Sequence, residues 1–95
     1  MSRPQRNENN QDANQADWFV YLIRCGDGTL YCGIALDAEA RLKQHQEGKG
    51  AKYTRGRGPL VLAYREACGT KIEALRRERV IKRMPRAAKL RLCAP

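Results

Sequence analysis

One apolar run, WFVYLIRC at residues 18–25, limits the fold of this chain more than any other segment. Its β-branched and aromatic side chains leave almost no polar face, which is typical of a strand buried on both sides in the centre of a sheet. Gly26, Asp27 and Gly28 follow as a turn, and the apolar run resumes as LYCGIA at residues 30–35. The sequence therefore predicts an antiparallel hairpin whose first strand is central.

The length of the turn decides which face of the sheet the two tyrosines of this hairpin occupy. If the loop has three residues, Cys25 opposes Thr29 across the hairpin. Tyr31 then opposes Ile23 and shares a face with Tyr21, because side chains alternate along a strand. A loop of two residues places the two phenols on opposite faces. The sequence permits both loops.

The next segment, AEARLKQHQE at residues 38–47, has the pattern of a helix. Asp37 is a good N-cap in front of it, and a glycine follows its end. Arg41 and His45 are four residues apart, so they are neighbours on one face of this helix. We place both on the shoulder of its apolar stripe, facing the sheet.

The second half of the chain predicts one more strand and two more helices. PLVLAYREA at residues 59–67 has the composition of a strand. Thr70 and Glu73 form a capping box that opens a helix over residues 70–84, and a proline then ends it. Residues 86–95 can add a short last helix. The predicted class is therefore α+β, a small three-stranded antiparallel sheet flanked by helices.

Length and composition predict one small domain behind a polar tail. Residues 1–16 are rich in Asn, Gln and charged side chains and nearly lack apolar ones, so we expect them to be disordered. Residues 17–92 then form the domain, because a chain of 95 residues has room for a single modest core.

The charge is strongly positive and unevenly distributed. The formal net charge is +9, and residues 41–95 carry sixteen Lys and Arg against four Asp and Glu. Residues 1–40 carry three against six. A basic surface of this density indicates a polyanionic partner, of which nucleic acid is the commonest and an anionic membrane surface the next. No segment has transmembrane length, and we expect no membrane partner.

The four cysteines contain no CxxC pair, which argues against a zinc site. No stretch near the N-terminus has the length of a signal peptide. We therefore expect reduced thiols and a cytoplasmic protein.

Several residues occur in the order and at the spacing of a known signature. They are V-Y at Val20 and Tyr21, Y-C-G at residues 31–33, R-x-x-x-H at Arg41 and His45, and a helical glutamate at Glu78. This pattern resembles the GIY-YIG nuclease superfamily. The phrase GAKYTRGRGPLVLAYRE is similar to its small stand-alone single-domain bacterial group (UPF0213-like). The resemblance covers Trp18 to about Lys89.

The resemblance implies a metal-dependent endonuclease that hydrolyses phosphodiester bonds in DNA. Structure-selective cleavage in DNA repair or recombination, with Mg²⁺ (or Mn²⁺) as cofactor, is the expected activity. DNA is the expected partner in preference to RNA. The residues that the resemblance places in the catalytic site are Tyr21, Tyr31, Arg41, His45 and Glu78.

Each of these residues has a chemical role that fits phosphodiester hydrolysis. Glu78 is the candidate metal ligand, against the plainer reading of an i,i+4 ion pair with Lys82. Arg41 suits a bidentate contact with the scissile phosphate. Tyr31 is the candidate general base, and His45 is a candidate relay for its proton. The plainer reading of both tyrosines is as ordinary strand aromatics.

A basic loop and one later lysine are the candidate nucleic-acid contacts, with an aromatic ring among them that could stack on an unpaired base. These residues are Lys49, Lys52, Tyr53, Arg55, Arg57 and Lys89. The plainer but less favoured reading of the loop is a solvated flexible segment. The sequence offers no dedicated base-reading helix, so we expect recognition of shape more than of sequence.

One departure from the family pattern keeps a second function open. Several family members have an asparagine in the C-terminal part of the site, whereas this chain has no asparagine after Asn14. Lys89 is the candidate substitute as a phosphate contact. The alternative function is a non-catalytic nucleic-acid-binding module that retains the GIY-YIG fold.

Overall fold

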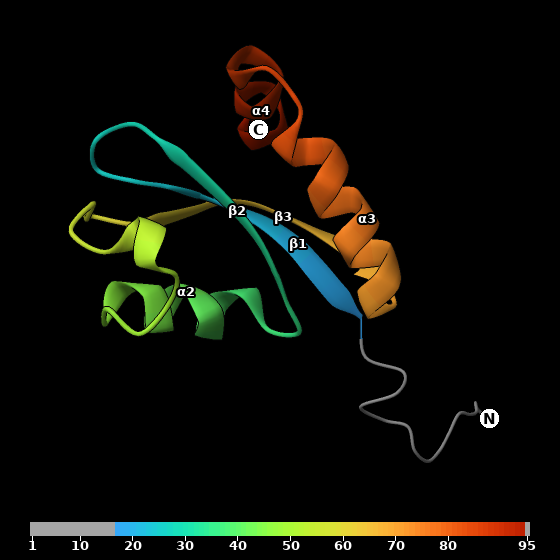
Figure 1. The fold of residues 1–95 in the computed structure, drawn as a ribbon, viewed down its shortest axis with the longest axis horizontal. Coiled ribbons are helices and arrows are strands. Elements are labelled where there is room, and N and C mark those ends of the chain that lie inside the picture. Colours follow the sequence, from blue (N-terminus) through green and yellow to red (C-terminus); the bar gives the residue numbers. More distant parts are fainter. Residues whose placement is uncertain (1–16, 95) are drawn as a thin grey trace.

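The computed structural model describes residues 17–94, and the predicted polar tail at residues 1–16 lies outside that range. Its strands form one antiparallel sheet in the order β2-β1-β3: β1 (Trp18–Arg24), β2 (Leu30–Ala35) and β3 (Val61–Gly69). Its helices are α2 (Ala38–Gln46), α3 (Lys71–Lys82) and α4 (Arg86–Cys93), with a 3-10 turn η1 (Lys52–Thr54) before β3. Figure 1 shows this arrangement, which confirms the predicted α+β class.

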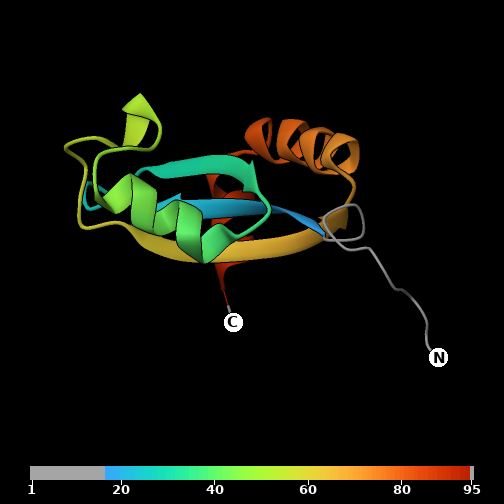
Figure 2. The ribbon, with the colours of Figure 1, turned by 90° about the horizontal axis from the view of Figure 1, so that it is seen from below.

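Strand β1 is the central strand, as its apolar sequence predicts. Val20 and Leu22 are fully buried on one face, where they pack with Ile81 of α3. Tyr21 and Ile23 are at most 1% exposed and pack on the other face, with residues of α2. Helices α2 and α3 therefore cover opposite faces of the sheet (Figures 1 and 2).

The hairpin closes with the three-residue loop. The amide of Cys25 donates to the carbonyl of Thr29 at 2.9 Å, and Ile23 lies opposite Tyr31. Gly28 has φ +87°, a conformation that glycine adopts without steric cost. The alternative that places both phenols on one face is therefore the correct one.

Local capping signals set the helix starts where the sequence predicts them. The side chain of Asp37 accepts a hydrogen bond from the amide of Ala40, and the capping box of Thr70 and Glu73 forms both of its bonds. The boundaries differ by one or two residues elsewhere. Helix α3 ends at Lys82, shortly before Pro85. Helical dihedrals are disfavoured for the residue that precedes a proline, here Met84.

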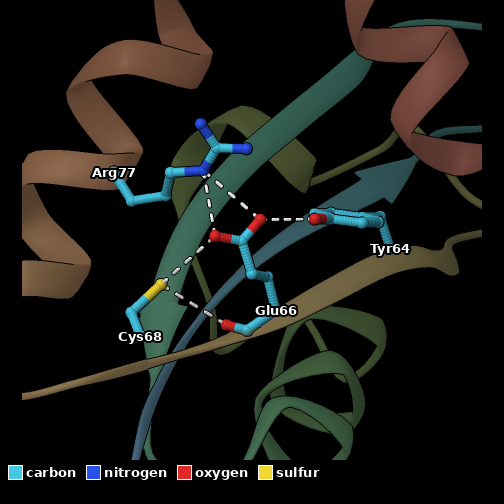
Figure 3. A network of polar contacts seen from close by, with 4 residues as sticks. All are labelled: Tyr64, Glu66, Cys68 and Arg77. Atoms are coloured by element: carbon cyan, nitrogen blue, oxygen red, sulfur yellow. Dashed lines mark hydrogen bonds and ion pairs between the residues drawn. The ribbon is translucent and has the colours of Figure 1, made fainter.

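A polar network joins α3 to β3 (Figure 3). The Nε of Arg77 donates to both carboxylate oxygens of Glu66, at 3.0 and 3.3 Å, and the hydroxyl of Tyr64 donates to the same carboxylate. Burial raises the pKa of Glu66, but the hydrogen bonds from Tyr64 and Arg77 outweigh burial and leave that pKa below its usual value. The network therefore anchors the helix that carries Glu78.

Two further findings concern residues 17–94. None of their helices combines the length and the apolar character needed to cross a bilayer. All four cysteines fall in this range, and each is a free thiol.

Candidate active site

The two signature tyrosines lie side by side on the face of the sheet that α2 covers. Tyr21 of β1 opposes Gly33, and Tyr31 of β2 opposes Ile23, so both rings project from the same face. Their ring centroids are 6.4 Å apart. The prediction that the phenols share a face is confirmed.

Helix α2 places its histidine directly against these phenols. The Nε2 of His45 lies 3.0 Å from the hydroxyl of Tyr21, and the imidazole meets the ring of Tyr31 edge-on, with centroids 5.2 Å apart. His45 is only 2% exposed, so it belongs to the buried stripe of α2 and not to its shoulder, as we had placed it. The helix packs closely enough on the sheet to enclose the whole ring.

The loop after α2 sets the tautomer of this imidazole. The amide of Ala51 donates to Nδ1 of His45 at 3.2 Å, and the hydroxyl of Thr54 lies 2.9 Å from the same atom. That hydroxyl also donates to the carbonyl of Ala51 at 2.9 Å. Because a backbone N–H can only donate, Nδ1 is the acceptor and the neutral ring carries its proton on Nε2. His45 therefore donates to the hydroxyl of Tyr21.

The pKa values of this pair move in opposite directions. Burial lowers the pKa of His45, and the positive charge of Arg41 lowers it further, so the imidazole is neutral at physiological pH. Burial and the neighbouring Tyr31 raise the pKa of Tyr21 to about 12, even though Arg41 acts in the other direction. Tyr21 therefore keeps its proton and can donate it in a hydrogen bond.

Two glycines leave the space that this pair occupies. A Cβ at Gly33 would lie 2.5 Å from the hydroxyl of Tyr21, and a Cβ at Gly50 would lie 2.1 Å from Nδ1 of His45. Our sequence analysis included Gly33 in the signature but missed Gly50 and Thr54. The available signal for them was weak, a glycine and a threonine in a loop that reads first as basic.

Arg41 lies one turn before His45 on α2 and completes the cluster. Its side chain is half-buried, and its Nη1 donates to Oε1 of Gln44 at 2.6 Å. Its positive charge acts to lower the pKa of both Tyr21 and His45. The structure thus brings four of the five predicted catalytic residues together.

Glu78 approaches from α3, on the other face of the sheet. Its side chain is 18% exposed, and its carboxylate lies 3.2 Å from Nζ of Lys82, so the i,i+4 ion pair that we considered does form. Burial raises the pKa of Cys32, and the negative charge of Glu78 raises it further, to about 11. Cys32 follows Tyr31 on β2, an edge strand, and points to the opposite face. Across residues 17–94, no direct hydrogen bond joins Glu78 to the tyrosines.

The side chains near the site could hold a metal ion only if the substrate supplied most of the ligands. Residues 17–94 contain no group of three or more His, Cys, Asp or Glu side chains that could hold an ion. Mg²⁺, however, commonly binds one or two carboxylates and takes its other oxygens from substrate phosphates and water. The single, largely buried carboxylate of Glu78 fits such a site, which the substrate must complete.

The basic loop is only partly free. The Nη1 of Arg57 pairs with Asp27 at 2.6 Å, and its guanidinium lies 4.4 Å from the centroid of the Tyr53 ring. Tyr53 is 43% exposed, and its ring centroid is 5.7 Å from that of Tyr31. Three predicted phosphate contacts of the loop are exposed: Lys49, Lys52 and Arg55. The loop thus reaches the cluster of Tyr21, Tyr31 and His45 through the ring of Tyr53.

Comparisons with known proteins show the family to which this chain belongs. The GIY-YIG catalytic domain model matches residues 17–91. A UPF0213 protein of Nitratidesulfovibrio vulgaris is 53% identical over 73 residues, which cover 77% of this chain and 66% of that protein. This chain therefore spans slightly less than two thirds of that relative. A UPF0213 protein of Staphylococcus aureus is 53% identical over 74 residues, covering 78% of this chain and 90% of the relative.

Two solution NMR structures are similar in fold. The UPF0213 protein of Bacillus halodurans is 45% identical, with a TM-score of 0.51, over 80% of this chain and 81% of its own. A protein of E. faecalis is 35% identical, with a TM-score of 0.53, over 77% and 78%. This chain belongs to the GIY-YIG catalytic domain family, a superfamily of nucleases, and its relatives include UPF0213 proteins.

Proposed function

We propose that this protein is a metal-dependent endonuclease that hydrolyses phosphodiester bonds in DNA. We further propose that it selects its substrate by structure and acts in DNA repair or recombination. The convergence of Tyr21, Tyr31 and His45 on one face of the sheet, with a hydrogen bond between Tyr21 and His45, is the observation that carries the proposal. Arg41 lies one turn before His45 on α2. The family match supports the proposal.

Hydrolysis of a phosphodiester needs charge neutralisation at the phosphoryl oxygens, where negative charge develops in the transition state. The guanidinium of Arg41 is the group in this cluster that supplies it. A planar guanidinium holds a phosphate with two parallel hydrogen bonds, a geometry that a lysine cannot reproduce. Because Arg41 lies one turn before His45 on α2, a phosphate that it holds would lie near the phenols that His45 contacts.

The attacking water also has to lose a proton. Tyr21 is a poor base, because its pKa of about 12 keeps it protonated. It acts instead as a donor that orients the water or a phosphate oxygen, and His45 fixes its direction. Tyr31 is less buried and lacks a hydrogen bond from His45, so we assign the general base to Tyr31.

Glu78 is the residue that would hold Mg²⁺ or Mn²⁺ at the edge of β2. When bound, the ion would supply Lewis-acid stabilisation of the phosphoryl oxygens. The ammonium of Lys82 now neutralises the same carboxylate at 3.2 Å. The lysine would have to yield part of that contact when the ion binds.

A cleavage assay tests this function. Labelled forks, flaps, junctions, duplexes and single strands of DNA are incubated with the protein in Mg²⁺, in Mn²⁺ and in a chelator. We expect cleavage that needs metal and favours branched or flapped DNA. Tyr31→Phe should abolish cleavage and keep binding without metal. Tyr64→Phe removes a phenolic hydroxyl from the other face of the sheet. Because Arg77 still donates to Glu66 in this variant, the helix that carries Glu78 stays anchored, and cleavage should remain near normal.

The same assay identifies the competing function. Binding to nucleic acid without cleavage of any substrate would support the non-catalytic nucleic-acid-binding module that the missing asparagine leaves open. Cleavage that Tyr31→Phe leaves unchanged would remove the phenol from the chemistry. Cleavage of RNA in preference to DNA would correct the substrate.

A further inference from the structure

A pocket lies where α4, the β1–β2 hairpin and the basic loop meet. It has a volume of about 220 Å³. Three segments far apart in the sequence line it, with the residues Thr29, Leu30, Tyr53, Arg86 and Lys89. We call it the α4 pocket. Only Tyr53 and Lys89 of this set belong to the contacts that the sequence indicates.

The α4 pocket carries two cations and no acid. Arg86 and Lys89 are three residues apart on α4, so they are neighbours on one helix face. The guanidinium of Arg86 extends over the hairpin turn, where its Nη2 would lie 4.0 Å from a Cβ at Gly28. Neither side chain forms an ion pair with any residue in the range 17–94. The nearby Asp27 is already paired with Arg57. The pocket therefore favours an anion.

The α4 pocket adjoins the catalytic cluster directly. One wall is Tyr53, whose ring centroid is 5.7 Å from that of Tyr31. Another wall is Leu30, which precedes Tyr31 on β2. A group bound in this pocket therefore lies one aromatic ring away from the proposed general base. The strand that is being cut is the ligand that reaches both places.

The size of the pocket limits its occupant. Pockets that hold whole small molecules measure roughly 300–1,000 Å³, so about 220 Å³ suits part of a larger ligand. Its walls combine an aromatic ring and an aliphatic side chain with two cations, which matches a base and a phosphate. A larger cavity of about 480 Å³ beside His45 has one side-chain cation, Arg55, and no aromatic wall except the imidazole. The α4 pocket is thus the better match to a nucleotide.

We propose that the α4 pocket binds one unpaired nucleotide of the substrate strand, next to the scissile phosphate. Arg86 and Lys89 contact its phosphate, and its base packs against Tyr53 and Leu30. This inference rests on the proposed function and specifies its substrate class: DNA that is single-stranded beside the cut. A base inside a duplex is stacked and paired, and its extraction costs a few kcal/mol, whereas an unpaired base enters without that cost.

Binding without metal tests the inference apart from catalysis. Fluorescence anisotropy compares a flapped duplex with a continuous duplex that has the same number of phosphates. The double variant Arg86→Gln/Lys89→Gln is measured beside the control Lys43→Gln/Arg76→Gln. The control removes two exposed charges from α2 and α3 that form no ion pair in the range 17–94.

We expect the pocket variant to lose about tenfold in affinity for the flap, a loss that corresponds to one good stacking or phosphate contact. On the continuous duplex it should lose no more than the control does. The salt slope on a single strand should fall by up to about 0.7, the value for the one phosphate that both cations contact. Tyr53→Leu should also weaken flap binding more than duplex binding. This variant tests the pocket a second time without a change of charge.

Equal losses in the pocket variant and the control, or equal losses on flap and duplex, would overturn the inference. Thermal melts of all variants show that each is folded before binding is compared. The proposed function fails by a different result, the absence of metal-dependent cleavage by the unmodified protein on every substrate. The two failures are therefore distinguishable.

Discussion

Tyr21 of β1 and His45 of α2, which are 24 residues apart in sequence, are joined by a hydrogen bond of 3.0 Å. Both side chains are at most 2% exposed. The buried imidazole stays neutral and the buried phenol stays protonated, so the pair has one fixed direction of donation, from Nε2 to the phenol. Each of the first two predictions depends on this pair.

Gly50→Ala should displace the imidazole from Tyr21, because its Cβ would lie 2.1 Å from Nδ1 of His45. Overpacking of a buried site typically costs about 1–3 kcal/mol in the free energy of unfolding. Cleavage should fall by about 10²-fold, as misplacement by an ångström can cause. Chemical denaturation and a cleavage assay measure both. Gly58→Ala is the control, since its Cβ would meet no atom within 4 Å. Equal behaviour of the two variants would contradict the role of Gly50.

The stability of the protein should decrease as the pH falls from about 6.5, the ordinary pKa of histidine. The pKa of His45 is lower in the folded chain, so below 6.5 the unfolded chain takes up the proton first, and stability is lost as the pH falls through the folded pKa. Above 6.5 both states are neutral and the effect is absent.

This chain has a single histidine, which makes the test clean. His45→Gln should show a flatter dependence of melting temperature on pH between about 7 and 5 than the unmodified protein does. Parallel curves for the two proteins would show that His45 is not the group whose titration destabilises the fold.

Glu78→Gln should separate metal binding from helix stability. The substitution keeps the side-chain volume and the helix propensity, but it removes the charge that would hold the ion. We expect cleavage to fall by orders of magnitude, with little recovery in extra Mn²⁺. Binding to DNA without metal should persist or tighten, because one negative charge is lost.

Lys82→Gln is the matched control for this change, because it breaks the same ion pair and leaves the carboxylate in place. An i,i+4 pair contributes only about 0.3–0.5 kcal/mol, so both variants should melt close to the unmodified protein. Cleavage should be lost in Glu78→Gln and retained in Lys82→Gln. Should both variants cleave normally, Glu78 is a helix ion-pair residue and not a metal ligand.

The basic loop should contribute to the salt dependence of DNA binding through its free cations. Changing Lys52 and Arg55 to Ala should lower the slope of log K against log salt on duplex DNA by up to about 0.9 per lost phosphate contact. Arg57→Ala should lower it less, because Arg57 is already paired with Asp27 and stacked on Tyr53. An unchanged slope in the Lys52 and Arg55 variant would remove this loop from the interface.

The helices and strands could be predicted from the sequence because the sequence signals that specify them are local. The N-cap at Asp37 and the capping box of Thr70 and Glu73 act within three or four residues, and each formed as predicted. The central position of β1 followed from an apolar run that only a strand buried on both faces can accommodate. These signals depend on residues that lie close together in the sequence.

The candidate site could be predicted from the sequence only in part. The sequence named Tyr21, Tyr31, Arg41 and His45, but it permitted two turn lengths, and the tertiary structure selected the one that places both phenols on one face. The sequence also did not show that α3, the helix of Glu78, packs on the face of the sheet opposite the tyrosines.

The remaining features depend on packing between distant segments. The tautomer of His45 is set by Ala51 and Thr54, which reach it only because the loop folds back over α2. The α4 pocket exists only where a hairpin, a loop and the last helix meet. Spacing along a chain predicts contacts within a few residues, whereas contacts across tens of residues are decided by which faces the packed elements bury together.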